Sequence, residues 1–150
     1  LNCPEEIYLS EKLIDMHKHL DMVRYARTGG EANAIAVRIA RAASGRDKIA
    51  ICGYHGWHDW YLSANLNNRD SNGILKDHLL PGLSTDGVPK NLKNTVYPFK
   101  FNDYEALEKI CSQNKIGVIK MEIFRNIPPK NNFLNKVRTL ATKKKYSFNF

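Results

Sequence analysis

Hydrophobic residues recur about every three to four positions in four segments of the chain, and this spacing predicts amphipathic helices. The predicted helices cover residues 4–20, 31–44, 103–114 and 132–143. In the first of them we expect one buried stripe, formed by Ile7, Leu13, Ile14 and Leu20.

The segment 31–44 has the strongest helical pattern. It contains six alanines, which have the highest intrinsic helix propensity. Arg38 and Arg41 are expected to face outward, and Gly45 is a natural C-terminal cap. We therefore predict a well-formed helix that ends at Ser44.

Short apolar runs predict the strands. They cover residues 22–26, Lys48–Cys52, 95–99 and Ile116–Met121, and alternating aromatic residues predict a further strand after 146. Strands and helices alternate along the chain, so the predicted class is α/β with a largely parallel sheet. In residues 53–94 the hydrophobic residues follow neither the helical nor the strand spacing. An irregular segment of this length is often functional.

The basic charge is uneven. The chain carries 23 Lys and Arg against 15 Asp and Glu, and the whole excess of +8 lies in residues 91–150. A nucleic-acid binder is one interpretation of such asymmetry. However, no basic stripe with interleaved aromatic residues and no known nucleic-acid motif is present, so we expect no nucleic-acid partner.

Other classes are excluded by composition. No apolar run approaches the roughly 18 residues that a membrane helix needs, so we expect no membrane partner. Three dispersed cysteines do not form a disulfide framework. The chain is therefore expected to be cytoplasmic.

Thr28, Gly29 and Gly30 form a turn between a predicted strand and the best helix. Glycines let the backbone approach a ligand closely, and a helix start offers unpaired N–H groups and a positive dipole end. This combination is typical of a phosphate site. The alternative is a plain strand-to-helix turn.

The second candidate segment follows the strand Lys48–Cys52. Ligands of open α/β sheets gather at the carboxyl ends of strands, and Tyr54 lies there, where its ring can stack on a flat ligand. His55 and His58 have a metal-like spacing, although no further ligands complete the set, so loop packing is the alternative. Trp57 and Trp60 fit a core or an interface as well as a binding role.

Glu122 is the third candidate, because it directly follows the strand Ile116–Met121. A carboxylate at a strand end is either functional or simply paired with Arg125. The local pattern leaves both interpretations open.

Residues 22–62 resemble the class III pyridoxal-phosphate-dependent aminotransferases, and within them the branch that contains glutamate-1-semialdehyde 2,1-aminomutase. Three landmarks occur in order: the turn at residues 28–30 followed by Glu-Ala, the pattern Ala-Arg-x-x-x-Gly-Arg-Asp-Lys at residues 40–48, and Tyr-His-Gly at residues 54–56. The resemblance extends over residues 4–142. It implies the large, mostly parallel-sheet domain of a fold-type I transferase, with pyridoxal 5′-phosphate as the cofactor.

The resemblance also implies residue roles. Thr28, Gly29 and Gly30 would bind the cofactor phosphate, and Tyr54 would stack on the pyridine ring with His55 beside it. Glu122 would lie near the cofactor. The family commonly has Ser-Gly-Thr at the turn and a Pro after the Glu, whereas this chain has Gly30 and Ile123. Asn126 is a looser match to a family Asn near the ring.

The family's catalytic lysine and the acidic partner of the pyridine nitrogen have no match in this chain. We therefore interpret residues 1–142 as part of a cofactor-binding domain and residues 143–150 as an aberrant or truncated tail. The resemblance implies transfer of an amino group between a small amino compound and a carbonyl by a homodimer. We expect the chain itself to be inactive. A non-catalytic phosphate- or nucleotide-binding module is the alternative.

Overall fold

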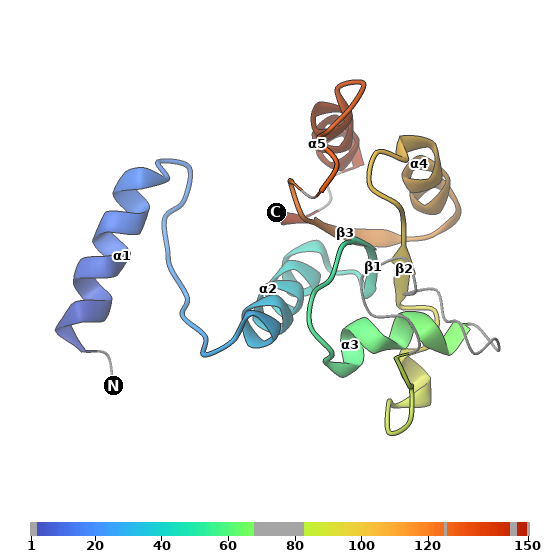
Figure 1. The fold of residues 1–150 in the computed structure, drawn as a ribbon, viewed down its shortest axis with the longest axis horizontal. Helices are drawn as coiled ribbons and strands as arrows, with labels where there is room; N and C mark the ends of the chain where they lie inside the picture. The colour runs from blue at the N-terminus through green and yellow to red at the C-terminus, as the bar shows by residue number, and fades with distance from the viewer. Residues whose placement is uncertain (1–2, 68–82, 125, 145–146, 150) are drawn as a thin grey trace.

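The computed structural model describes residues 3–67, 83–124, 126–144 and 147–149, and all structural statements below refer to these residues. Its centre is a sheet of four parallel strands in the order β2-β1-β3-β4 (Figure 1). The strands are β1 (Lys48–Cys52), β2 (Val96–Pro98), β3 (Ile116–Met121) and β4 (Ser147–Asn149). In the register, Ile49 of β1 lies opposite Val96 of β2 and Val118 of β3.

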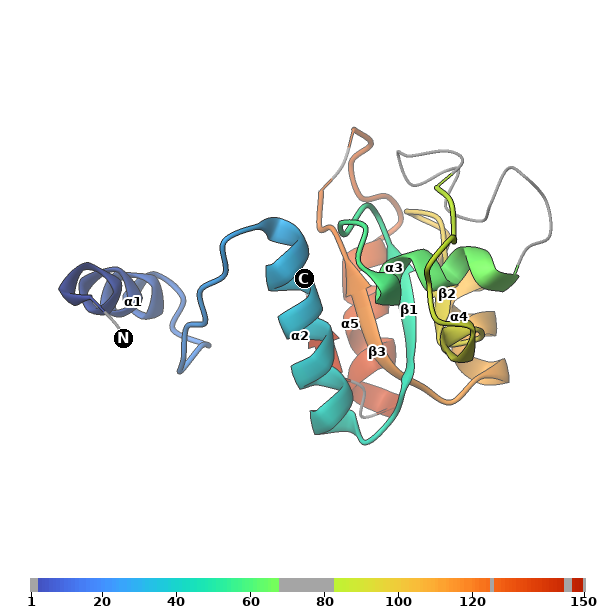
Figure 2. The ribbon, with the colours of Figure 1, turned by 90° about the horizontal axis from the view of Figure 1, so that it is seen from below.

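Helices cover both faces of the sheet (Figures 1 and 2). α2 (Gly29–Ser44) and α3 (Asp59–Leu62) lie on one face, and α4 (Tyr104–Gln113) and α5 (Phe133–Lys144) lie on the other. Short 3-10 helices, η1 (Ser63–Asn67) and η3 (Lys90–Leu92), follow α3 on its side. The structure therefore confirms the predicted α/β class with a parallel sheet.

Each face of the sheet has its own apolar core. The core under α2 and α3 contains aliphatic and aromatic side chains, among them Val37, Ile49, Ile51, Tyr61 and Val118. The core under α4 and α5 contains others, among them Leu107, Ile119, Met121, Phe133 and Val137. Because both faces are covered, β1 and β3 consist mostly of apolar residues, as buried parallel strands usually do, and Lys48 and Lys120 are their charged exceptions.

The strand directions decide where a ligand site can form. All described strand pairs are parallel, so the carboxyl ends of β1, β2 and β3 lie along one edge of the sheet. The C-terminus of α2 leads into the start of β1 through Gly45, which has a left-handed φ of 63°. α2 therefore runs back along the sheet, and its N-terminus reaches the edge where β1 ends.

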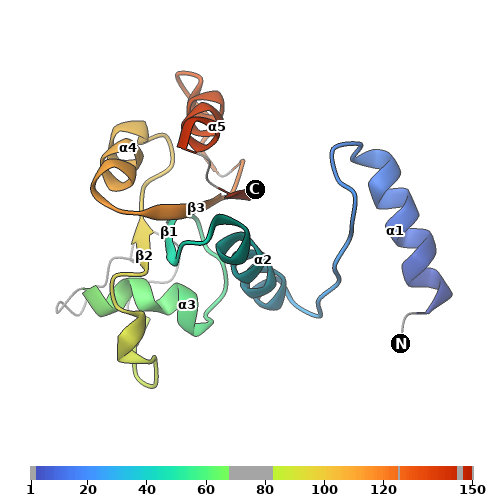
Figure 3. The same ribbon diagram turned by 180° about the vertical axis from the view of Figure 1, so that it is seen from behind.

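α1 (Pro4–Met16) stands apart from the sheet (Figures 1 and 3). The prediction of a helix to residue 20 with a buried stripe is wrong, because α1 ends at Met16 and has no buried residue. Ile7 and Leu20 are exposed. Helical periodicity shows that a segment is amphipathic, but only a packing partner buries its apolar face.

Three further predictions need correction. Residues 22–26 form no strand, since no described strand lies beside them. The segment 53–94 contains α3, η1 and η3 within its described part. Arg41 is half-buried rather than outward-facing, and burial lowers its pKa while Asp47 opposes the shift.

No helix in the described part of the chain combines the length and apolarity that crossing a bilayer requires.

Candidate functional site

The start of α2 is built from Thr28, Gly29, Gly30 and Glu31. The Thr28 Oγ1 accepts a hydrogen bond from the Glu31 N–H at 3.1 Å, which caps the helix. The Glu31 carboxylate accepts one from the Arg27 N–H at 2.8 Å. The N–H groups of Gly29 and Gly30 belong to the first helical turn and have no acceptor within the helix. An anion can therefore reach two free backbone donors here.

The capping role of Glu31 was not predicted from the sequence. Glu31 occupies the third helical position after a threonine cap, and the pattern Thr-x-x-Glu is the signature of a capping box. This signal was present in the sequence, and it predicts that the helix begins at Gly29. The structure shows this beginning, two residues before the predicted one.

The loop after β1 packs directly on the start of α2. Gly56 has a φ of 97°, and an added Cβ there would lie 3.0 Å from the Cα of Gly30. Gly53 has a φ of 104°, and an added Cβ there would lie 2.8 Å from the Glu122 carboxyl group. Both positions favour glycine because of the left-handed φ and the close neighbours. The two glycines let the loop approach α2 on one side and β3 on the other.

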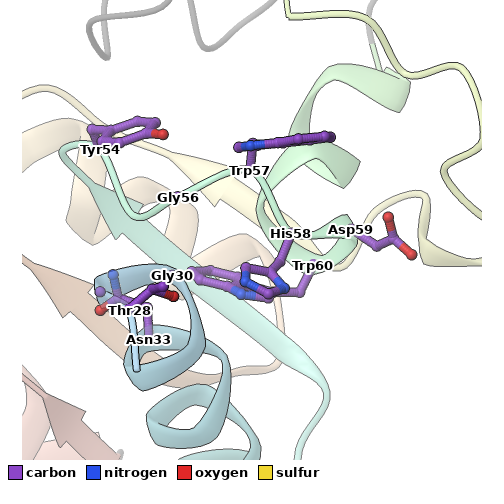
Figure 4. Close-up of a pocket in the computed structure, with 10 residues that line it drawn as sticks. Thr28, Gly30, Asn33, Tyr54, Gly56, Trp57, His58, Asp59 and Trp60 are labelled. Carbon is purple, nitrogen blue, oxygen red and sulfur yellow. The ribbon is translucent and has the colours of Figure 1, made fainter. Parts of the chain in front are cut away.

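A cleft of about 950 Å³ opens beside this contact between the loop and the start of α2 (Figure 4). Thr28, Gly29 and Gly30 line it from the helix, and Tyr54 and Trp57 line it from the loop. Two of the three sequence-predicted groups, the glycine turn and Tyr54, therefore meet at one site. An added Cβ at Gly29 would meet no atom within 4 Å, so the space beside this residue is open.

Tyr54 is half-buried and held by its neighbours. Its ring packs edge-on against Tyr61, with ring centres 5.8 Å apart and an angle of 89° between the planes. The Tyr61 hydroxyl donates to the Gly53 carbonyl at 3.2 Å. This packing fixes the position of the Tyr54 ring at the cleft.

His55 is turned into the protein and is only 3% exposed. Its Nε2 lies 3.0 Å from the Cys52 carbonyl oxygen, and its ring stacks on Trp60 with an angle of 24°. The Asn33 amide donates to the His55 carbonyl at 3.2 Å. These contacts hold the loop against α2 and the end of β1.

The remaining aromatic residues divide between surface and core. Trp57 is 72% exposed, whereas Trp60 is 8% exposed and belongs to the core under α2 and α3. The Trp60 Nε1, which belongs to a residue lining the cleft, has no acceptor among the described residues. His58 lies against Gly30, where an added Cβ would approach its ring to 3.0 Å. No group of three metal-binding side chains occurs among the described residues.

Glu122 borders a second, smaller cleft of about 380 Å³ at the carboxyl end of β3. Tyr54 and Asn33 line both clefts, so the third predicted group lies next to the other two. Lys120 lines this cleft as well. The proposed pairing of Glu122 with Arg125 falls outside the described residues, and Asn126 is exposed.

Comparison with models of known protein families gives no match. Among curated proteins, the chain is 34% identical over 146 residues to glutamate-1-semialdehyde 2,1-aminomutase of Ignicoccus hospitalis, covering 91% of this chain and 32% of that protein. It is 32% identical over 141 residues to 3-aminobutyryl-CoA aminotransferase of Cloacimonas acidaminovorans, covering 89% of this chain and 29% of that protein.

Comparison with solved structures also finds transaminases and aminomutases. An omega-transaminase from Sphaerobacter thermophilus matches with a TM-score of 0.78 and 25% identity, over 99% of this chain and 35% of that one. The resemblance seen in the sequence is therefore confirmed. Over about 90% of its length, the chain is similar in sequence to curated aminotransferases and aminomutases. A glutamate-1-semialdehyde-aminomutase from Pseudomonas aeruginosa PAO1 has the same fold, with a TM-score of 0.72, 23% identity and coverage of 99% and 32%.

The chain spans about a third of the length of the aminotransferases and aminomutases that it matches. It corresponds to a parallel-sheet part of these enzymes, as the sequence predicted.

Proposed function

We propose that this chain forms the part of a pyridoxal-phosphate-dependent aminotransferase or aminomutase that holds the cofactor phosphate and covers one face of its ring. One observation carries the proposal: the glycine-lined start of α2 and the Tyr54 ring border the same open cleft. An anion-binding helix start beside an aromatic face fits a ligand that combines a phosphate with a flat ring.

The donors at the helix start fit a phosphate. Gly29 and Gly30 contribute backbone N–H groups, and the helix dipole adds a partial positive charge. Thr28 Oγ1 accepts from the Glu31 N–H, and its hydroxyl proton remains to donate to a phosphate oxygen. The buried Trp60 Nε1 is a further donor beside this cleft that lacks an acceptor in the described part of the chain. Because Gly30 has no side chain, the site has one hydroxyl donor fewer than the Ser-Gly-Thr turn that the aminotransferase family commonly has.

The ring side of the site would be formed by the loop after β1. Tyr54 would stack on the pyridine ring, since Tyr61 fixes its orientation. His55 would hold the loop that carries Tyr54 in place, since its Nε2 lies 3.0 Å from the Cys52 carbonyl oxygen and its ring contacts Tyr61. We propose that Glu122 lies at the polar edge of the pyridine ring, because it lines the smaller cleft together with Tyr54.

When bound, pyridoxal phosphate supplies an electron sink that permits amino-group transfer. This sequence has no match to the family's catalytic lysine or to the acidic partner of the pyridine nitrogen. We therefore expect these 150 residues by themselves to bind the cofactor without transferring an amino group between a small amino compound and a carbonyl. In the whole protein we propose a homodimer, with the exposed Trp57 at the subunit interface.

Binding of 4-deoxypyridoxine 5′-phosphate tests the proposal, because this compound has the phosphate and the ring but no aldehyde. Gly29→Leu fills the open space beside the helix start, and we expect its affinity to fall at least about tenfold. Ala43→Leu, at an exposed position near the other end of α2, is the matched control and should leave the affinity unchanged. Isothermal titration calorimetry measures both.

Three results would count against the proposal. Equal affinities of the two leucine variants would mean that the ligand does not use the helix start. Inorganic phosphate or AMP binding as tightly as the ring compound would favour the non-catalytic phosphate-binding module. Amino-group transfer by the purified chain would overturn the expected inactivity.

A further inference from the structure

A separate cleft, which we call the amino-edge cleft, lies where the strands of the sheet begin. It has a volume of about 400 Å³ and opens between three loops. Residues 45–47 lead from α2 into β1, residues 93–95 lead from η3 into β2, and Lys115 leads from α4 into β3. Because β2, β1 and β3 are parallel neighbours, their starts bring these loops together. The amino-edge cleft therefore lies at the opposite edge of the sheet from the proposed cofactor site.

The amino-edge cleft is strongly basic. Four cations line it: Arg46, Lys48, Lys93 and Lys115. Asp47 is the one carboxylate among its described lining residues. Lys93 and Lys115 are exposed and form no ion pair of 4.0 Å or less within the described part of the chain. Cations that converge in this way repel one another, and a bound anion relieves the repulsion.

The sequence pattern gives this cluster further weight. Lys93 and Lys115 belong to residues 91–150, which carry the whole charge excess of the chain and which the proposed function does not explain. Arg46 and Lys115 follow the ends of α2 and α4, where cations offset the helix dipole. Lys93, however, follows only the three-residue helix η3, and Lys48 lies in a strand. Helix dipoles therefore account for only half of the cluster.

The loops that carry these cations are held in place by packing and hydrogen bonds. The Arg46 Nη1 donates to the Ile116 carbonyl at 2.8 Å. Gly117 packs on the same loop, since an added Cβ there would lie 2.5 Å from the Arg46 Cβ. The Thr95 hydroxyl donates to the Leu92 carbonyl at 2.6 Å. Because the loops have a fixed geometry, little conformational freedom is lost when a ligand binds between them.

The lining favours a compact and highly charged ligand. Apart from Gly45, every described lining residue is charged or polar, so neither a nucleic-acid base nor an apolar peptide side chain finds a surface to pack on. The strands β2 and β3 flank β1, so their starts lie about 10 Å apart. A chain of two or three linked phosphates can contact cations on both strands at once, whereas a single phosphate is too small to span this width.

We propose that the amino-edge cleft binds a short phosphate chain, either free or as part of a nucleoside triphosphate. Arg46, Lys93 and Lys115 donate charge-assisted hydrogen bonds to the phosphate oxygens. The length of β1 separates this site from the start of α2, so binding here does not depend on the proposed function.

Calorimetric titration with inorganic tripolyphosphate at constant ionic strength tests the site. Lys93→Gln/Lys115→Gln removes two cations from the cleft, and we expect the affinity to fall about tenfold. Lys12→Gln/Lys130→Gln is the matched control, because it removes the same charge from exposed positions in α1 and in the loop after β3. The control should change the affinity by less than about twofold. Equal losses in the two variants would overturn the proposal, since net charge alone would then explain the binding.

Further titrations distinguish the ligands. ATP and tripolyphosphate should bind with similar affinities, because the polar lining gives a base no surface to pack on. Inorganic phosphate should bind at least about tenfold more weakly, because it makes fewer charge-assisted hydrogen bonds. Equal affinity for phosphate and tripolyphosphate would contradict the proposal. A single-stranded oligonucleotide that binds more tightly than tripolyphosphate would do so as well, since it would identify a nucleic-acid surface.

Competition separates this site from the proposed cofactor site. Saturating 4-deoxypyridoxine 5′-phosphate should leave the affinity for tripolyphosphate unchanged, because the two clefts lie at opposite edges of the sheet. Displacement of tripolyphosphate by this compound would mean that both bind at the start of α2, and the amino-edge site would be wrong. If tripolyphosphate binds as expected and 4-deoxypyridoxine 5′-phosphate does not bind, the proposed function fails and the amino-edge site stands.

Discussion

The starts of α2 and α4 are alike in their capping and different in what surrounds them. Thr28 accepts from the Glu31 N–H at 3.1 Å, and Asp103 accepts from the Ala106 N–H at 2.9 Å. Both caps therefore satisfy the third helical N–H in the same way. A capped helix start by itself does not distinguish a binding site from an ordinary helix.

The difference lies in the residues that follow each cap. α4 continues with Tyr104 and Glu105, so two large side chains directly follow its cap. α2 continues with Gly29 and Gly30, and the loop after β1 packs on it through Gly56. Each first turn contains one glutamate, Glu31 or Glu105, but the cap of α4 is itself a carboxylate, whereas the cap of α2 is a neutral threonine. The comparison teaches that a site needs an accessible helix start together with a second element that encloses it.

The largest expected effect concerns the contact between the loop and α2. Gly56→Ala places a Cβ 3.0 Å from the Gly30 Cα at a φ of 97°, and we expect the free energy of unfolding to fall by about 3 kcal/mol. Gly87 has a φ of 82° but open space around it, so Gly87→Ala should cost only about 1 kcal/mol. Urea unfolding measures both. Equal losses would show that the close approach of the two glycines contributes nothing to stability.

Exchanging the two caps sharpens the comparison. Thr28→Asp keeps a good cap but adds a negative charge, so we expect the affinity for 4-deoxypyridoxine 5′-phosphate to fall about 10- to 100-fold. Asp103→Thr should leave this affinity unchanged, since α4 lies on the opposite face of the sheet. Calorimetric titration of both variants gives the answer. A similar affinity in the Thr28→Asp chain would mean that phosphate does not bind at α2.

Removing each cap should have equal effects on stability and unequal effects on binding. Thr28→Ala and Asp103→Ala each lose one capping bond, and we expect each to lower the free energy of unfolding by about 1 kcal/mol. Only Thr28→Ala also removes a hydroxyl donor, which should weaken phosphate binding by about fivefold. Unfolding and titration of the same samples test this together. Weakened binding in the Asp103→Ala chain would indicate a general loss of structure instead.

The smallest expected effect is a pH dependence of stability caused by Lys120. Its pKa in the folded chain lies below the ordinary value of 10.5, so the unfolded chain binds the proton more tightly. Stability is therefore fully present above pH 10.5 and is lost as the pH falls through the folded-state pKa. Urea midpoints between neutral and alkaline pH should rise less steeply in Lys120→Met than in Lys48→Met. Parallel curves for the two variants would contradict the lowered pKa.

Much of the fold follows from local patterns. The strand Ile116–Met121 and the helix with its Asp103 cap were predicted from the sequence and occur within one residue of the predicted bounds. Such elements have apolar periods and caps that are strong local signals. Residues 22–26 were predicted wrongly as a strand, because strand formation needs a neighbouring strand that the sequence does not reveal.

The candidate site divides in the same way. Thr28, Gly29, Gly30 and Tyr54 were selected from the sequence because glycine turns and aromatic residues after strands have direct physical meaning. Loop packing of His55 was one of the interpretations that the sequence left open, and the structure confirms it. The burial of Lys120 was not predicted, because it depends on how distant elements pack. In the sequence alone, Lys120 is an ordinary polar residue within a strand. Only the packing of the sheet and α2 shows that it is buried.

By itself, the sequence determined the order of helices and strands, the glycine turn and the family resemblance, since these depend on residue types and short spacings. The tertiary structure decided which groups share a site. Parallel pairing of β1 and β3 brings Tyr54 and Glu122 to one sheet edge, and the reversed direction of α2 returns Gly29 to the same edge. The physical reason is that strand direction and close backbone contact, such as that of Gly56 on Gly30, join residues far apart in the chain.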